Sequence, residues 1–197
     1  VAAAISTNAV LTAVNLGSNT IGECADVLIE AFEQNDKVRT LLGIDEGIEV
    51  LDLSNKKVDP GQAKILGAEL CLGRNTAALT SLSLAGNAIT GSKDEGSRDR
   101  RGEWVPDWKY DLDLSGLAAL GEGMAASQTL ASVDFSGCKM GPAAVAELSK
   151  FIPSMAALTS LNLAGNALSG SKNEGWEKRK GESWAPQKKS WKEEKRG

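Results

Sequence analysis

Apolar residues recur along this chain in short segments that share one spacing. Five segments fit the pattern L-x-x-L-x-L-x-x-N-x-L, strictly or loosely, and they begin at Leu11, Ile48, Leu79, Leu130 and Leu158. Within each segment two apolar residues stand two positions apart, as Leu82 and Leu84 do. A period of two places alternate side chains on one face of a strand. Each segment therefore predicts a short strand with one buried face.

The polar position of the pattern predicts how the segments stack. It is asparagine in three copies, namely Asn19, Asn87 and Asn166. The side-chain amide can donate to, and accept from, backbone groups that a turn leaves unpaired. Stacked copies would therefore form a ladder of asparagines. Lys56 and Cys138 replace the asparagine in the other two copies, although Asn55 could take the role of Lys56 if that turn is shifted.

Helices are expected between the strands, where apolar residues return at intervals of three and four. The first helix is predicted over residues 23–35. Asp59 and Pro60 are typical of an N-cap and a first-turn proline. Ser115 and Gly141-Pro142 open two further helical segments.

Residues 37–47 are additional to this alternation. Their apolar members, Val38, Leu41 and Ile44, fit either a degenerate strand or the end of a helix. We expect an irregular connection that distorts the stack between the first two units.

A longer internal repeat identifies the class of fold. Residues 79–96 are LTSLSLAGNAITGSKDEG and residues 158–175 are LTSLNLAGNALSGSKNEG. Such self-similarity is typical of repeat proteins, whose units bury their apolar edges by stacking on neighbours. Over residues 1–169 the strand, the asparagine and the following helix resemble the leucine-rich repeat of the ribonuclease-inhibitor type. The resemblance implies an α/β leucine-rich repeat solenoid, a fragment of a curved horseshoe with parallel strands on the concave side and helices on the convex side.

The composition sets wide limits. Hydrophobic residues make up 42% and charged residues 24% of the 197 positions, which is ordinary for a globular protein. No apolar run reaches the roughly 18 residues of a membrane helix, so we expect no transmembrane segment. Cys24, Cys71 and Cys138 are too few and too widely spaced for a disulfide framework or a zinc site. We expect these three cysteines to be small buried apolar residues. Because they form no disulfide framework, we also expect an intracellular protein, most simply a cytoplasmic one.

Catalytic chemistry has little support in the sequence. The chain contains no histidine, which removes the commonest general base and metal ligand. It also lacks a G-x-x-x-x-G-K-S/T phosphate loop and a G-x-S-x-G nucleophile motif. We therefore expect a protein that is not an enzyme and that has no cofactor and no metal.

Two related stretches set this chain apart from a plain repeat array. Residues 91–111 form a charged insertion, and residues 170–197 form a charged C-terminal extension that is a second copy of it. Both carry G-S-K-D/N-E-G, then charged residues, then glutamate and a Trp-x-Pro motif. Together they hold all five tryptophans and the one tyrosine. The candidate partner-binding residues in them are Trp104, Trp108, Tyr110, Trp176, Trp184 and Trp191.

The insertion allows two interpretations. It could fold back over the edge of the solenoid, so that its tryptophans cover apolar surface. Alternatively, exposed Trp and Arg side chains could anchor a protein partner, as they do at binding hot spots. We expect Trp104 and Trp108 to pack on the body, and Trp184 and Trp191 to be exposed or covered by a partner.

Charge separates the body from the extension. Residues 170–197 contain nine basic and five acidic side chains, which gives them a net charge of +4. Because the whole chain has a net charge of −4, residues 1–169 have a net charge of −8. The outward strand positions are small, polar and weakly acidic, and Glu49, Asp52 and Asp134 are candidates for binding a basic or polar partner. The basic extension could contact nucleic acid or an anionic membrane, but its interleaved acids argue against nucleic acid as a partner.

These features predict a non-catalytic protein-interaction or scaffold module with a protein partner. An alternative is a structural subunit that its Trp-bearing insertions dock into a larger assembly. A remote alternative is contact of the basic extension with nucleic acid or an anionic membrane. Residues 1–5 resemble the last turns of a preceding helix, so we expect the sequence to be a piece of a longer array; a proteolytic boundary is the alternative.

Overall fold

The computed structural model describes residues 1–169 of the chain. The predicted extension, residues 170–197, with Trp176, Trp184 and Trp191, lies outside the described residues. Four short strands form one parallel sheet: β1 (Val50–Asp52), β2 (Ser81–Ser83), β7 (Ser132–Asp134) and β8 (Ser160–Asn162). Their order in the sheet, β1-β2-β7-β8, is their order in the sequence.

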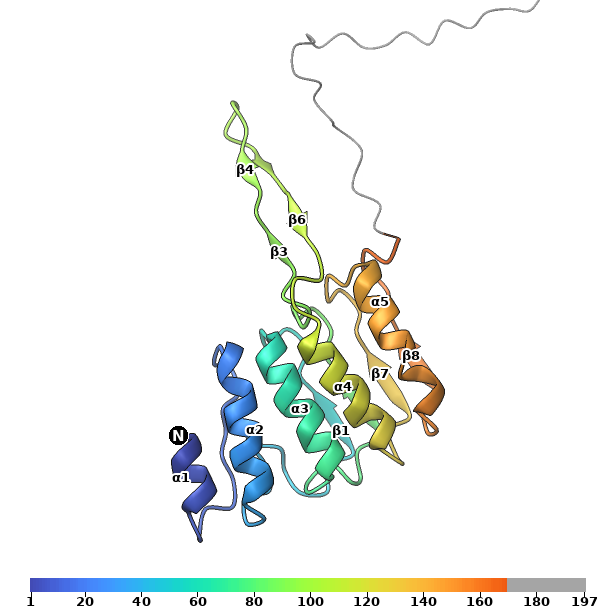
Figure 1. Cartoon of the computed structure of the whole chain (residues 1–197). Helices are drawn as coiled ribbons and strands as arrows, with labels where there is room; N and C mark the ends of the chain where they lie inside the picture. Colours follow the sequence, from blue (N-terminus) through green and yellow to red (C-terminus); the bar gives the residue numbers. More distant parts are fainter. Residues whose placement is uncertain (170–197) are drawn as a thin grey trace, which may run out of the picture.

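Helices stand in a row beside the strands (Figure 1). They are α1 (Ala2–Thr7), α2 (Ala25–Gln34), α3 (Pro60–Leu72), α4 (Ser115–Ala126) and α5 (Pro142–Ser149), with short 3-10 turns η1 (Gly22–Cys24) and η2 (Ile152–Ser154). Each step from one strand of the sheet to the next passes through a helix. The expected mixed α/β architecture with parallel strands is therefore confirmed. We call residues 1–91 and 111–169 the repeat body.

The strands pair in the register that the leucine pattern predicts. Leu51, Leu82 and Val133 lie side by side, and Leu82 and Leu84 are only 1% and 0% exposed. Ser81 and Ser83 lie on the opposite, half-buried face of the same strand. The period of two thus sorts the side chains into a core and an open face.

The core has two parts. The first gathers around Ile5, Phe32 and Leu41, and the second runs from Ile44 through the strands to Leu148 and Met155. Helix α3 is shared between them, because its Ile65 belongs to the first cluster and the neighbouring Leu66 to the second. Helices α3 and α4 also pack closely, since a Cβ on Gly67 would lie 2.3 Å from the carbonyl oxygen of Ala119.

Helix α3 begins where the sequence predicts. The Asp59 carboxylate accepts a hydrogen bond from the Gln62 amide (2.7 Å), and the Gln62 side chain accepts one from the Asp59 amide (3.3 Å). This reciprocal capping box satisfies two of the backbone donors that a helix start leaves free. Pro60 occupies the first turn, and Gly73 ends the helix with a φ of 61°, a conformation that glycine adopts without steric strain.

The asparagine ladder forms at two of its predicted positions. Asn87 donates to the carbonyls of Leu84 (2.7 Å) and Leu53 (2.8 Å) and accepts from the amide of Val58 (3.0 Å). Asn166 repeats this arrangement one strand beyond Cys138, whose buried thiol donates to the Leu84 carbonyl (3.1 Å). The ladder therefore joins neighbouring units of the sheet.

The ladder is broken at the first step. Lys56 is exposed, and Asn55 is exposed as well, with a φ of 56°. The suggested shift of the ladder to Asn55 is wrong, since no hydrogen bond of its side chain is found among the described residues. Asn19 is exposed and donates only within its own turn, to the carbonyls of Leu16 and Gly17.

Residues 37–47 form a degenerate strand, which is one of the two structures that their pattern allows. Val38, Leu41 and Ile44 are buried. Isolated bridges pair Thr40 with Ala13 and Leu42 with Asn15. No backbone hydrogen bond within residues 1–169 links this segment to β1, so it interrupts the sheet, as expected.

A buried carboxylate compensates for that interruption. Glu69 of α3 is 2% exposed and accepts hydrogen bonds from the amides of Leu41 (2.6 Å) and Leu42 (2.8 Å) and from the Thr40 hydroxyl (3.0 Å). Burial raises the pKa of Glu69 above its ordinary value, although these hydrogen bonds oppose the shift. The Glu69 side chain thus holds this segment in place, whereas in a continuous sheet backbone hydrogen bonds to the neighbouring strand would do so.

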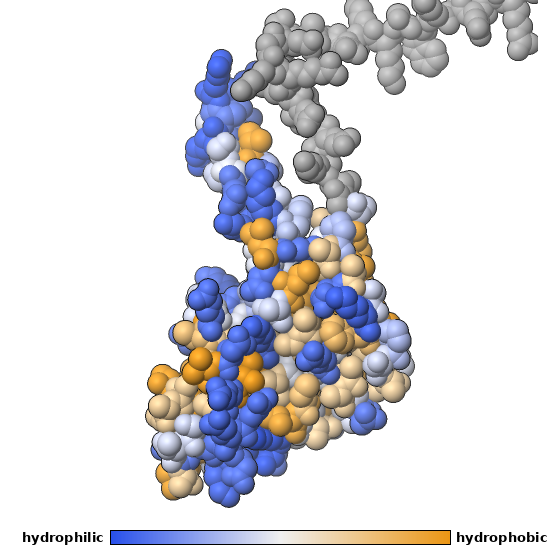
Figure 2. Space-filling view, in the orientation of Figure 1, coloured by the Kyte–Doolittle hydropathy of each residue, from blue (hydrophilic) through white to orange (hydrophobic). Residues whose placement is uncertain are grey.

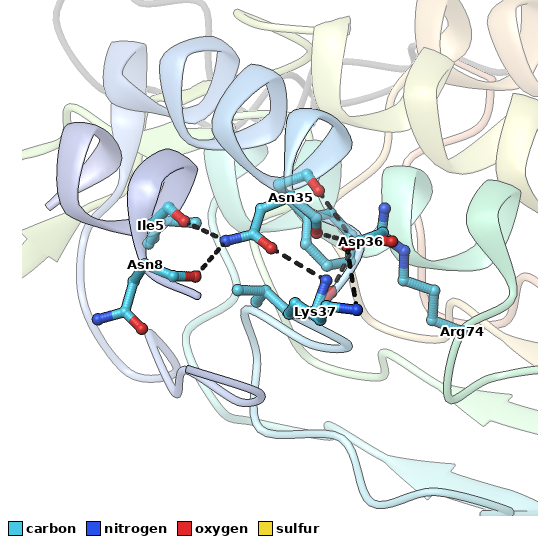
Figure 3. Close-up of polar contacts among 8 residues, drawn as sticks. Ile5, Asn8, Asn35, Asp36, Lys37 and Arg74 are labelled. Atoms are coloured by element: carbon cyan, nitrogen blue, oxygen red, sulfur yellow. Dashed lines mark hydrogen bonds and ion pairs between the residues drawn. The ribbon is translucent and has the colours of Figure 1, made fainter. Parts of the chain in front are cut away.

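Further side chains tie the first helices to this segment (Figure 3). Asn35 donates to the carbonyls of Ile5 (2.6 Å) and Asn8 (2.9 Å) and accepts from the amide of Lys37 (2.9 Å). The Arg74 guanidinium donates to the carbonyls that end α2, those of Phe32 and Asn35, at 2.9 Å each. These contacts satisfy helix ends that have no following strand to cover them.

The expectation for the cysteines is only partly met. Cys138 is buried, but Cys24 and Cys71 are exposed, and all three are free thiols. The two exposed cysteines lie on the outward sides of helical turns, a detail that helical spacing alone does not fix. No helix within residues 1–169 is long and apolar enough to span a membrane.

Candidate functional site: an aromatic hairpin

The insertion forms a β-hairpin that projects from the repeat body (Figure 1). Strand β3 (Lys93–Asp94) pairs with β6 (Trp108–Lys109), and β4 (Ser97–Arg98) pairs with β5 (Trp104–Val105), both antiparallel. The Glu95 amide donates to the Asp107 carbonyl (2.9 Å) between the two strand pairs, so the register is continuous. We call residues 92–110 the hairpin.

The tip and the middle of the hairpin are closed by two aspartates. At the tip, Asp99 accepts from the amides of Arg101 (2.8 Å) and Glu103 (3.0 Å), and Gly102 has a φ of 80°. In the middle, where Gly96 faces Pro106, the Asp94 carboxylate accepts from the amides of Gly96 and Asp107. The hairpin therefore satisfies its own backbone without help from the repeat body.

Asp94 also positions Trp104. The Trp104 Nε1–H donates to the second oxygen of the same carboxylate at 2.8 Å. This bond is the largest cause of the lowered pKa of Asp94. The indole is thus oriented from within the hairpin, and yet 53% of the residue is exposed.

The expectation that the insertion folds back over the body is wrong for Trp104. A fold-back would be favoured if the loop left polar backbone and an indole unsatisfied, because the body could then supply partners. Here the antiparallel ladder and Asp94 supply them locally. Trp108 behaves as expected, since it is partly buried at the root and Lys139 of the body lies over its ring, with Nζ 5.2 Å from the centroid.

The two faces of the hairpin differ in character. Alternation along paired strands places side chains of opposite residues on the same face. One face carries Asp94, Arg98, Trp104, Pro106, Trp108 and Tyr110. The Trp108 and Tyr110 rings are stacked, with centroids 6.2 Å apart and planes inclined by 22°. We call this side the aromatic face.

The opposite face carries charges that pair with each other. Lys93 lies 2.6 Å from Glu95, and Lys109 lies 2.9 Å from Asp107. Val105, which is 51% exposed, is the apolar residue of this face. Figure 2 accordingly shows a mostly hydrophilic hairpin.

The root of the hairpin is bonded to the next helix of the body. Asp111 has a φ of 56°, and its carboxylate accepts from the amides of Gly141 (2.8 Å) and Ala144 (3.0 Å) at the start of α5. The Asp111 amide in turn donates to the Ser92 hydroxyl (2.9 Å). Both strands of the hairpin are therefore fixed to the N-terminus of α5.

The acidic candidates lie apart from the hairpin, on the open face of the sheet. Asp52 and Asp134 share one row, with Ser83 between them, which separates them by about 10 Å. Each closes the turn that comes after its strand: Asp52 accepts from the Ser54 amide (2.8 Å) and Asp134 from the Ser136 amide (2.7 Å). These acids thus have a structural role, and the face offers no aromatic anchor.

The pKa values of Asp52 and Asp134 reflect the hydrogen bonds of the same turns. Hydrogen bonds from Ser54 lower the pKa of Asp52. Burial works to raise the pKa of Asp134, but hydrogen bonds led by Ser136 outweigh it and the net shift is downward. Glu49 is exposed, and its backbone carbonyl, not its carboxylate, accepts from the Thr80 amide (2.8 Å). Within residues 1–169, no three His, Cys, Asp or Glu side chains gather as a metal site.

Comparisons with known proteins add little to this description. No protein-family model matches the chain, and no curated protein sequence matches it. Among solved structures, the chain is similar to leiomodin-1 actin-binding site 2, with a TM-score of 0.43 and 20% sequence identity over 82% of this chain and 76% of that one. A likeness at this level assigns no function to the chain.

Proposed function

We propose that the chain is a non-catalytic protein-interaction module, in which a leucine-rich repeat solenoid of the ribonuclease-inhibitor type presents the aromatic face of its hairpin to a protein partner. The exposed Trp104 carries the proposal. Its indole is oriented by Asp94, and its ring is left open beside Arg98, Pro106 and Trp108. Rigid aromatic residues next to arginine are the side chains on which binding energy concentrates.

The size of the contact supports a specific interaction. An indole side chain can bury about 200 Å², so a residue that is 53% exposed offers roughly 100 Å² to a partner. At about 25 cal/mol per Å² this contact would stabilise a complex by about 2.5 kcal/mol, or roughly 70-fold in Kd. The hairpin is already ordered by its own hydrogen bonds, so little further ordering opposes binding.

Two further observations support the proposal, one at the tip of the hairpin and one at the cysteines. Arg100 and Arg101 at the tip form no ion pair among the described residues, which leaves them available to acceptors at the rim of a contact. The free thiols of Cys24 and Cys71 favour a reducing, intracellular compartment, as disulfides are typical of oxidising ones. The absence of catalysis remains a proposal that rests on the histidine-free sequence.

A truncated hairpin tests the proposal. Replacing residues 96–106 by Asn-Gly joins Glu95 and Asp107, whose backbones are hydrogen-bonded to each other, through a two-residue turn of the favoured type. Asp111 and its bonds to α5 stay in place. We expect this variant to lose the partners that the intact chain retains in affinity purification followed by mass spectrometry.

A matched pair of point variants locates the contact. Trp104→Ala should weaken binding of the recovered partner by about 70-fold. Val105→Ala is its control, because Val105 is equally exposed (51%) but lies on the charged face. Equal loss of binding in both variants, or none in either, would show that the aromatic face is not the contact.

A further inference from the structure

A cleft of about 270 Å³ opens where the asparagine ladder is broken. It lies between the turn after the first strand-like segment and the turn after β1. Polar and apolar residues both line it: Asn15, Gly17, Ser18, Leu42, Leu53, Lys56, Val58, Gln62 and Leu66. None of these residues is acidic.

The ladder explains why the cleft is open. One unit further on, Asn87 fills the equivalent place by bonding to Leu53 and Val58 of the preceding unit. At the step between the first unit and β1, the residue in that position is Lys56, which is exposed. The Ile21 amide, which corresponds to that of Val58, donates to the Asp59 carboxylate instead (3.0 Å). No side-chain amide therefore occupies the space.

Side chains with hydrogen-bond donors that have no acceptor among the described residues line this cleft. Gln62 is only 3% exposed, and its Oε1 accepts from the Asp59 amide. Its Nε2 has no acceptor among the described residues. Because no fully buried side-chain nitrogen or oxygen of residues 1–169 lacks a partner, this Nε2 is not fully buried, and Gln62 lines the cleft.

Two more donors stand at the same cleft. The Asn15 side chain uses its Oδ1 to accept from the Gly17 amide (2.9 Å), which leaves its Nδ2 free. Lys56 forms no ion pair within the described residues, although its charge contributes to the lowered pKa of Asp52. The ammonium can therefore reach an anion in the cleft. Amide and ammonium groups are donors, and charge-assisted hydrogen bonds to a carboxylate are the stronger ones.

We propose that this cleft binds an aliphatic carboxylate. The carboxylate would accept from Gln62, Asn15 and Lys56, and the hydrocarbon would lie on the floor of Leu42 and Leu66. The volume equals roughly nine water molecules at ~30 Å³ each, which suits a leucine-sized acid. Such a group can be a free branched carboxylic acid or the C-terminal leucine of a peptide.

Binding is measured on the whole chain by following the side-chain amide NMR signals of Gln62 and Asn15. The probes are 4-methylpentanoate and acetyl-Gly-Leu, each compared with its uncharged carboxamide. We expect both signals to shift with at least one acid, at a Kd of about 1 mM, and the carboxamides to bind about tenfold more weakly. The tighter of the two acids identifies the source of the ligand.

Variants connect the affinity to the cleft. Lys56→Met should weaken binding of the acid by about fivefold. Lys57→Met is the control, since Lys57 is exposed, does not line the cleft, and has a φ of 60° that the substitution does not change. Lys56→Asn should close the ladder, abolish binding and raise the Tm. Equal binding of acid and carboxamide, an unaffected Lys56→Met variant, or the absence of any shift in the Gln62 and Asn15 signals would overturn the proposal.

Discussion

Replacing Asn87 by alanine tests the ladder most directly. Asn87 is 2% exposed and makes three bonds below 3.1 Å, to the carbonyls of Leu84 and Leu53 and from the amide of Val58. The two carbonyls keep other donors, because Leu84 also accepts from the Cys138 thiol and Leu53 from the Lys56 amide. The Val58 amide keeps none and would be left buried and unpaired.

The magnitude can be worked from these bonds. One orphaned buried amide costs about 1–3 kcal/mol, and two lost bonds to carbonyls cost about 0.5–1.5 kcal/mol each. We expect Asn87→Ala to lower the free energy of unfolding by about 2–6 kcal/mol. For a chain of this size, each kcal/mol lowers the Tm by about 2–4 °C, so the shift should be roughly 4–24 °C.

Circular dichroism during urea unfolding, with the Tm measured in parallel, gives both quantities. Asn19→Ala is the matched control, because Asn19 is exposed and bonds only to carbonyls of its own turn. It should change the free energy of unfolding by less than about 0.5 kcal/mol. Equal effects of the two substitutions would refute the view that the ladder, rather than local turn geometry, joins the units.

Four other substitutions have defined outcomes. Leu82→Ala should lower the free energy of unfolding by about 2–5 kcal/mol. Ser83→Ala loses one hydroxyl contact of 2.6 Å to Ser54 and should cost no more than about 1 kcal/mol in the same urea experiment. A similar loss in both variants would mean that the strand register is wrong. Glu69→Gln can keep the two backbone bonds without a buried charge. Because the folded pKa of Glu69 is raised above its ordinary 4.5, its contribution to stability is present below that pH and lost as the pH rises through the folded value. The Gln variant should therefore exceed the native chain in Tm at pH 7 and lose that advantage near pH 4; a constant difference would contradict the assignment. Asp111→Ala should cost about 1–2 kcal/mol by uncapping α5, while the Asn-Gly hairpin truncation should leave the Tm nearly unchanged.

The alternation of apolar residues places the helices and four of the five predicted strands. The segment that begins at Leu11 forms only isolated bridges, at Ala13 and Asn15, and no strand of the sheet. Leu82 and Leu84 are buried, and Asp59 caps α3, as predicted, because these features depend on neighbours close in sequence. The exposure of Cys24 and Cys71 does not emerge from the pattern, since it depends on how far each helix turns toward the next. The breaks at Lys56 and at residues 37–47 are visible in the sequence, but their consequence for packing depends on contacts between distant segments.

The sequence marks residues 91–111 as an insertion but does not by itself predict a hairpin there. The signal is nevertheless present: residues at alternate positions from Trp104 to Tyr110 are aromatic or proline, and Asp99 and Gly102 are typical of a turn. The role of Asp94 depends on the register of the hairpin, which pairs Trp104 with Arg98 and brings its indole within reach of Asp94. The spacing of the residues does not specify that register. Charge makes Asp52 and Asp134 candidates for binding, whereas their position two residues before a turn amide explains them.

The interruption of the sheet beside β1 has a consequence for how the body loses structure. The first hydrophobic cluster is joined to the second through α3, Leu42 and the side chains around Glu69 and Arg74, without the backbone ladder that unites β1 to β8. Cooperativity across such a seam is weaker than within a continuous ladder. Residues before Ile44 would then unfold as a separate cooperative unit and exchange their amide hydrogens before the rest of the body. Helix α3, which contributes to both hydrophobic clusters, would stay folded.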